Sequence, residues 1–203
     1  MKKMMSDFHI HSYYSPDSLN PPCLILKLAR RCGLDIIAIT DHDTIKGGLA
    51  GKKYMRNSGI EVIVGAEILT DAGDIIGLNL TDEIRSRQYE EVIEEIHNQG
   101  GLVTFPHPFR GHKHIEQIAH LADFIEIWNG RSSPEQNQKA LELSKALHLK
   151  KMVGSDAHLP TEIGNARALI SDQWLLQEYE VHPFHTYELY ISQSVKRMRK
   201  KFA

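Results

Sequence analysis

The sequence predicts an α/β fold in which βα units surround a parallel sheet, and three observations lead to this class. Short apolar runs rich in Ile and Val alternate along the chain with segments of helical periodicity. Several runs are apolar throughout, as expected of strands buried on both faces. Side chains of metal-ligand type stand at or just past the ends of these runs, and the strand ends of a closed parallel barrel meet on one face.

The strands are expected where an apolar run is short and bounded by turn residues. Such runs lie at 6–11, 35–40, 61–68, 75–80, 102–106, 124–129 and 152–156. The alternation of strand-like and helical segments stops at Val181. Residues 181–203 are therefore the least defined part of the expected fold.

Helices are expected where start and stop signals bracket an apolar periodicity. Asn20 is the expected N-cap of a helix that begins with two prolines, runs to Arg31 and stops at Gly33. The segment 86–99 has apolar residues at helical spacing and ends at a Gly-Gly pair. A Ser-Pro-Glu sequence opens a further helix over 133–147.

Composition sets broad limits on the class of protein. The chain has 203 residues, enough for a full core, and we treat 1–203 as a single domain. A formal charge of -2 gives no overall basic footprint for nucleic acid. Cys23 and Cys32 lie nine residues apart on one expected helix, too far apart for a disulfide within it, so we expect a cytoplasmic protein. No apolar stretch has the length of a signal peptide or a membrane span, and no pattern specifies the oligomeric state.

The most informative feature is a set of imidazole and carboxylate side chains at the expected strand ends. His9 and His11 alternate along one strand and therefore point to the same side. A lone histidine is more often a core or surface residue, but further candidates follow the same strand-end rule: Asp41, His42, Glu67, His107, Asp156 and His158. These donors, without paired cysteines, suit zinc, manganese or iron, and their number exceeds what one ion needs. A bridging carboxylate such as Glu67 or Asp156 and a hydroxide between two ions would hydrolyse a phosphate ester or an amide.

Five motifs in order give the set a specific resemblance. They are Asp7-Phe8-His9-Ile10-His11-Ser12 with Ser15-Pro16-Asp17-Ser18, Ile39-Thr40-Asp41-His42-Asp43, Gly65-Ala66-Glu67, His107-Pro108-Phe109-Arg110 and Ser155-Asp156-Ala157-His158. Over roughly residues 6 to 170 the chain resembles the PHP (polymerase and histidinol phosphatase) family. The resemblance implies a distorted seven-stranded βα barrel similar to a TIM barrel, up to three metal ions and phosphoester hydrolysis.

Carried over residue by residue, the resemblance implies three sets of ligands. The first ion would be held by His9, His11, Glu67 and Asp156, the second by Glu67 and His107, and the third by Asp17, His42 and His158. Two positions depart from the family, in which many members have a histidine in place of Asn129 and some in place of Asp74. Asn129 would be a weak neutral ligand, and Asp74 is either a hard ligand or a surface carboxylate.

Several other side chains have two interpretations each. Arg110 is expected to clamp a phosphoryl group, while Arg131 either binds phosphate or forms a loop ion pair. Lys46 is expected to open a solvated helix, and the basic run 194–201 to form a solvated last helical turn rather than a phosphate or nucleic-acid site.

Four polar positions near the motifs are expected to lie outside the ligand set. The His112 and His114 pair is expected on a surface loop. Asp41 and Asp43 are expected to orient His42 rather than to bind metal.

The leading functional hypothesis is a phosphoesterase with two or three divalent ions (Zn, Mn or Fe). It would act on a small phosphorylated metabolite or nucleotide, with Glu67, Asp156 and Arg110 at the reacting centre. The alternatives are a nuclease that trims 3′ ends, which is less favoured without a basic surface, and a non-catalytic metal-binding module. Amidohydrolases also begin with a His-x-His strand, but the middle strands here offer no clear candidate for their lysine or paired histidines.

Overall fold

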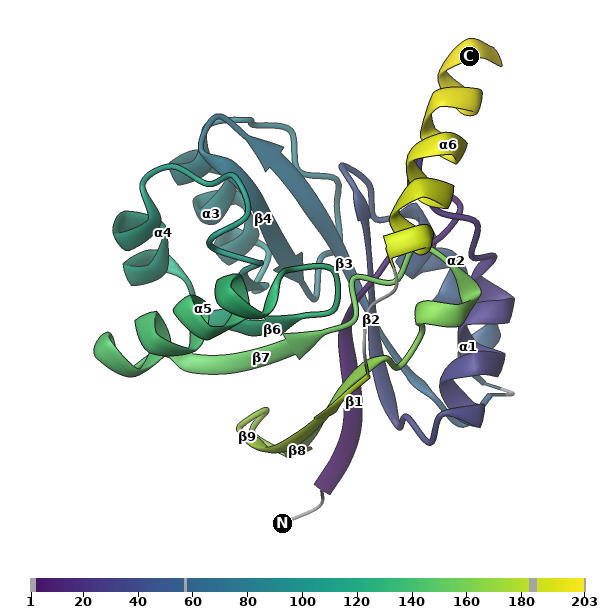
Figure 1. Ribbon diagram of the computed structural model, residues 1–203, viewed down its shortest axis with the longest axis horizontal. Coiled ribbons are helices and arrows are strands. Elements are labelled where there is room, and N and C mark those ends of the chain that lie inside the picture. The colour runs from purple at the N-terminus through teal and green to yellow at the C-terminus, as the bar shows by residue number, and fades with distance from the viewer. Residues whose placement is uncertain (1–2, 57, 183–185, 203) are drawn as a thin grey trace.

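The computed structural model describes residues 3–56, 58–182 and 186–202. Its strands are β1 (Lys3–Ile10), β2 (Ile36–His42), β3 (Glu61–Thr70), β4 (Gly73–Leu78), β5 (Leu102–Phe105), β6 (Phe124–Asn129), β7 (Lys150–Gly154), β8 (Ala166–Ser171) and β9 (Leu176–Val181). Its helices are α1 (Pro22–Arg31), α2 (Lys46–Met55), α3 (Tyr89–Asn98), α4 (Ile115–Leu121), α5 (Pro134–Ala146), the 3-10 turn η1 (Pro160–Glu162) and α6 (Thr186–Phe202). Figure 1 shows α1 and α2 at the right of the molecule and α3, α4 and α5 at the left.

The strands form one sheet that curls into a nearly closed barrel. Their order is β7-β6-β5-β4-β3-β2-β1-β8-β9. The sheet closes on itself where Ala157, just after the edge strand β7, forms a parallel bridge with Ile10 of β1. Gly154 is required there because a Cβ at this position would overlap the Cβ of His9. The α/β barrel expected from the sequence is therefore confirmed.

The sheet differs from the expected seven parallel strands in two ways. β4 is antiparallel to both β3 and β5, and the hairpin of β8 and β9 adds two strands beside β1. Only Asp71 and Ala72 separate β3 from β4, and so short a connection can join only antiparallel neighbours. The expectation of a wholly parallel sheet was wrong at these strands, and the strand count is nine within the described residues.

The expected helix signals mostly hold. Ser133 forms a capping box with Gln136 at the start of α5, and Gly33 has a positive φ just after α1. Asn20 is not a cap: Pro21 is the N-cap of α1, and the Asn20 amide instead donates to the carbonyls of His11 and Ala157 across the barrel seam. α4 was not expected, and the basic run lies on α6, a helix of 17 residues.

Three clusters of buried apolar side chains fill the layers between the sheet and its helices and the inside of the barrel. The polar side chains at the strand ends lie outside these three clusters. No helix in the described part of the chain is long and apolar enough to cross a membrane.

Candidate metal centre

The strand-end side chains come together as the sequence predicts. The face where β1, β2, β3, β5 and β7 end carries the eight expected ligands, His9, His11, Asp17, His42, Glu67, His107, Asp156 and His158. All are buried except His42, whose side chain is 26% exposed. Imidazole and carboxylate side chains are thus buried together, away from water. Such burial is costly and is typical of a metal or catalytic site.

Glu67 lies at the centre of this group. Its Oε2 is 3.4 Å from Nε2 of His9, 3.2 Å from Nε2 of His11 and 3.2 Å from Nδ1 of His42. Its Oε1 is 2.8 Å from Nε2 of His107. A single carboxylate therefore faces four imidazoles, with one oxygen toward His107 and the other toward the remaining three. This is the placement that a carboxylate shared between two cations requires.

Asp156 is the second shared carboxylate. Its Oδ1 is 3.3 Å from Nε2 of His11 and 3.4 Å from Nδ1 of His158, and its Oδ2 is 2.7 Å from Nη2 of Arg110. The backbone at Asp156 has φ 55, a left-handed conformation that is uncommon for a residue other than glycine. His107 also has a positive φ, of 29.

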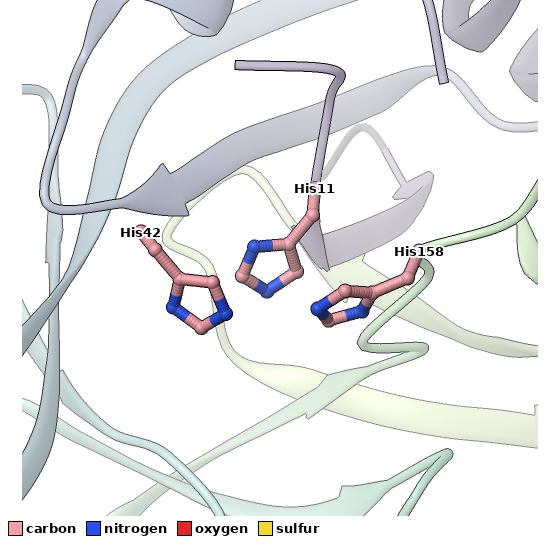
Figure 2. Close-up of side chains that lie close together, drawn as sticks. All are labelled: His11, His42 and His158. Atoms are coloured by element: carbon pink, nitrogen blue, oxygen red, sulfur yellow. The ribbon is translucent and has the colours of Figure 1, made fainter. Parts of the chain in front are cut away.

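A third group lies toward the mouth of the site. Figure 2 shows the imidazoles of His11, His42 and His158 turned toward one another, and the ring centroids of His42 and His158 lie 4.5 and 4.1 Å from that of His11. The carboxylate of Asp17 faces two of these rings, with Oδ2 3.6 Å from Nε2 of His42 and Oδ1 3.4 Å from Nε2 of His158.

Several buried polar atoms of these groups have no hydrogen-bond partner within the described residues and could bind cations. Oδ1 of Asp17 and Oδ1 of Asp156 are buried and accept no hydrogen bond within the described residues. Nε2 of His9 and Nε2 of His11 lie only 3.1 Å apart, so two ring nitrogens converge on one point. Buried carboxylate oxygens without a donor, beside converging imidazoles, are the donor set of a zinc, manganese or iron site.

The outer nitrogens of the first pair of imidazoles are each held by a fixed partner. Nδ1 of His9 is 3.0 Å from Oε1 of Glu126. Nδ1 of His11 is 3.1 Å from Oγ of Ser15, whose hydroxyl donates to Asp41. Each partner accepts from Nδ1–H, which leaves both Nε2 atoms as lone-pair donors to the centre. Asp41 thus acts through Ser15 on His11, and the same Ser15 Oγ accepts from the backbone N–H of His42 at 3.0 Å, so Asp41 also supports the turn at His42 as expected.

Two further carboxylates near the ligands differ from what the sequence predicts. Glu126 was missed, although a lone carboxylate inside the apolar strand Phe124–Asn129 could have signalled it. Asp43 pairs with Arg87 on the surface.

Electrostatics favours the metal-binding protonation states at several ligands. Burial would raise the pKa of Glu67, but His9 and His42 outweigh it and hold that pKa well below its usual range. Burial opposes ionisation of Asp156 in the same way, and His9 and Arg110 hold its pKa low. Burial, together with His11, lowers the pKa of His158 to about 3. These carboxylates are therefore ionised and His158 is neutral at pH 7, as ligands must be.

His112 lies against the expected second site rather than on an open surface loop. The side chains of Asp74, His107 and His112 each offer a ligand atom within 4.8 Å of the others. Nδ1 of His107 and Nδ1 of His112 are buried without a hydrogen-bond partner, and burial and His107 lower the pKa of His112 to about 4. Both Asp74 and His112 are half-buried, whereas His114 is exposed, as expected.

Asn129 is occupied by hydrogen bonds. Its Oδ1 accepts from Nη1 of Arg110 and from the backbone of Arg131, and its Nδ2 donates to Glu126 and Asp156. The geometry therefore favours a role for Asn129 in holding its neighbours by hydrogen bonds over the metal-ligand role that the sequence left open.

The two arginines differ in what they can do. Arg110 is one-third exposed and lines a cavity of about 310 Å³ together with Asp17, Glu67 and Asp156. Arg131 is buried and makes a two-oxygen pair with Glu162 and a bond to Ser192. The structure thus favours the ion-pair alternative for Arg131. Lys46 is exposed at the start of α2, as expected.

Comparison with known proteins decides the family. The family model for the PHP domain matches residues 7–181. The chain belongs to the PHP family. This PHP chain is 45% identical over 117 residues to the uncharacterized protein MJ1587 of Methanocaldococcus jannaschii, an alignment that covers 52% of the chain and 68% of the relative. It is 34% identical over 186 residues to MJ0417 of the same organism, with 83% and 71% covered.

Other relatives are more distant. A 5'-3' exoribonuclease of Haemophilus influenzae is 38% identical over 77 residues, which cover 36% of the PHP chain and 28% of the exoribonuclease. Among solved structures, a two-domain protein of Bacteroides vulgatus that contains a predicted PHP-like metal-dependent phosphoesterase aligns with TM-score 0.72 and 22% identity over 86% of the chain. The PHP chain spans 61% of that protein's length. An amidohydrolase of Chromobacterium violaceum aligns with TM-score 0.64 and 16% identity over 92% of the chain and 96% of that protein. At these identities the two structures establish the fold alone.

Proposed function

We propose that this PHP domain hydrolyses phosphate esters of a small phosphorylated metabolite or nucleotide with the help of two or three divalent ions. The observation that carries the proposal is the sharing of Glu67 and Asp156, each of which faces imidazoles of more than one group while Asp156 also holds Arg110. Candidate metal ligands and the Arg110 guanidinium, which could bind phosphate, thus line one cavity.

The ligand groups suggest how the ions would be distributed. One ion would lie among His9, His11, Glu67 and Asp156, and another among Asp17, His42 and His158. For the remaining ion the geometry supports Asp74, His107 and His112, with Glu67 beside them, because Asn129 is committed elsewhere. When bound, such ions supply Lewis-acid polarisation of a phosphoryl oxygen and increase the acidity of a water nucleophile.

Side chains of the protein would bind the phosphoryl group and orient the metal ligands. Asp156 and Asn129 fix the plane of the Arg110 guanidinium, and two hydrogen bonds leave other N–H groups of this side chain for a phosphoryl oxygen. A positioned cation of this kind stabilises the charge that develops on the phosphoryl group in the transition state. Glu126 and Ser15 hold the imidazoles of His9 and His11 in the orientation that metal binding needs.

Turnover of defined esters tests the proposal. Metal-free protein is incubated with phosphomonoesters and phosphodiesters after addition of Mn²⁺, Zn²⁺ or Fe²⁺, beside the matched variant Glu67→Gln. We expect metal-dependent release of phosphate by the native chain and its loss in the variant. An absence of turnover with every metal and ester would contradict the proposal and would favour a non-catalytic metal-binding module.

A nuclease is the second candidate, and one surface feature supports it. Tyr13 and Tyr14 stack with ring centroids 4.6 Å apart and are about two-fifths exposed, just after the His9 and His11 strand. Exposed aromatic rings beside cations can stack bases of a single strand. Shortening of end-labelled oligonucleotides at either end, faster than hydrolysis of a mononucleotide, would favour this candidate over a small-molecule phosphatase.

A further inference from the structure

One face of the C-terminal helix α6 contacts the rim of the metal centre. Ser192, Val195, Lys196 and Arg199 follow helical spacing, and the first two are buried. Ser192 accepts a hydrogen bond from Nη1 of Arg131 at 3.0 Å. Two turns further along, Nη1 of Arg199 donates to the carbonyls of Tyr13 and Ser15 at 2.7 and 2.8 Å. Figure 1 shows α6 projecting from the barrel near β2 and β3.

Lys196 lies between these two anchors and is the helix cation that reaches the cavity. Its Nζ is 3.4 Å from Oδ2 of Asp17, and its side chain lines the 310 Å³ space together with Arg110. The side chain is 59% exposed, in contrast to 6% for Arg131. The basic run that the sequence suggested to be a solvated helix end thus places one ammonium inside the site.

The carboxylate beside Lys196 is shared. Asp17 also faces His42 and His158, so the ammonium is one of three groups that compete for it. A cation among these ligands would neutralise Asp17 and repel the ammonium, whose flexible stem can turn toward the cavity. An anion in this cavity would then meet cationic side chains from two segments of the chain, Arg110 after β5 and Lys196 on α6.

We infer that Lys196 is a substrate-binding residue and that α6 makes this a site for terminal phosphoryl groups. The inference rests on the proposed function and names its substrate class. A terminal phosphoryl group carries up to two charges and can pair with both cations that line the cavity. An internal diester carries one charge and needs room for chain on both sides, whereas Ser192, Gln193 and Lys196 of α6 line part of this cavity. The substrates are therefore phosphomonoesters, including 5′- or 3′-terminal phosphates.

Binding of inorganic phosphate tests the inference without turnover. Calorimetric titration of the metal-loaded protein is compared for the native chain, Lys196→Met, Lys196→Arg and the matched control Arg197→Met, an exposed cation on the same helix. Loss of one charge-assisted contact weakens binding roughly tenfold or more, so Lys196→Met should bind phosphate at least about tenfold more weakly. Lys196→Arg should retain most of the affinity, and Arg197→Met should match the native chain. Equal affinity of Lys196→Met and the native chain would overturn the inference.

Two further measurements separate this inference from others. With p-nitrophenyl phosphate and bis-p-nitrophenyl phosphate, Lys196→Met should raise KM for the monoester with little change in kcat and should lower the monoester to diester preference. An unchanged preference would overturn the assignment to terminal phosphates.

Metal titration should show ions bound by Lys196→Met at least as tightly as by the native chain. Weaker metal binding with unchanged KM would mean that Lys196 only supports Asp17. Failure of the native chain to hydrolyse either ester would contradict the proposed function, while the phosphate titration would still decide on Lys196.

Discussion

Glu126 and His9 are joined by a 3.0 Å contact between Oε1 and Nδ1, although 117 residues separate them in the chain. The second carboxylate oxygen of Glu126 accepts from the backbone of His107 at 2.9 Å. One buried side chain of β6 therefore orients a ligand from β1 and the strained turn that carries a ligand after β5. Carboxylates in this position fix the ring and increase the basicity of the coordinating nitrogen.

Substitution of Glu126 should weaken metal binding. Glu126→Gln removes the charge that holds Nδ1–H of His9, and partners of this kind typically contribute about tenfold or more in metal affinity. Competition with a chelator should show this loss, whereas Glu116→Gln, an exposed change on α4, should bind metal like the native chain. Equal metal affinity in both variants would show that Glu126 does not support the ligand.

His112 and His114 form a natural pair of test and control. If the ion near Asn129 is held by Asp74, His107 and His112, His112→Ala should lower the ion content by about one per chain at equal free metal. His114→Ala should not, because that ring is exposed and stacks on Tyr89. Mass spectrometric metal analysis after gel filtration decides between them. An ion content that His112→Ala leaves unchanged would rule out this ligand set.

Metal binding should release protons and strengthen with pH. Burial opposes protonation of His11, but Asp156 and Glu67 outweigh it and raise its pKa to about 9. In the absence of a cation, His11 is therefore protonated at pH 7 and must lose that proton to bind one, so affinity should rise from pH 6 toward 9 and then level. Calorimetry in buffers of different ionisation enthalpy measures the released protons. An affinity independent of pH over this range would contradict the prediction.

Arg110 should affect turnover and leave metal content unchanged. Arg110→Met removes the cation beside Asp156 and should lower kcat/KM roughly 100-fold, the usual effect of losing one group that stabilises a transition state. Arg110→Lys should restore part of the rate because the charge returns without the planar pair of donors. Steady-state kinetics with metal analysis of the same samples tests this. A loss of rate that parallels a loss of ions would assign Arg110 to the metal site instead.

The ligands could be predicted from sequence because each is a local feature at the end of a strand, and a barrel brings such ends together. The direction of β4 was open to prediction as well, since the gap between the two expected strands is too short for a crossover. Other features depend on contacts that no local pattern contains. Glu126 reaches His9 across the barrel, and Lys196 meets Asp17 from 179 residues away. Arg131 and Asn129 likewise have polar partners that only the folded chain identifies.

The central claim is that hydrolysis of a phosphate ester depends on ions held by the strand-end ligands. It is tested most directly by adding Mn²⁺ stepwise to metal-free protein and recording phosphomonoester hydrolysis and bound ions in the same samples. We predict no hydrolysis without ions and a rate that rises with the number bound, in the native chain but not in His9→Ala or His11→Ala. A rate that is the same without ions, or no hydrolysis when the sites are full, would contradict the claim.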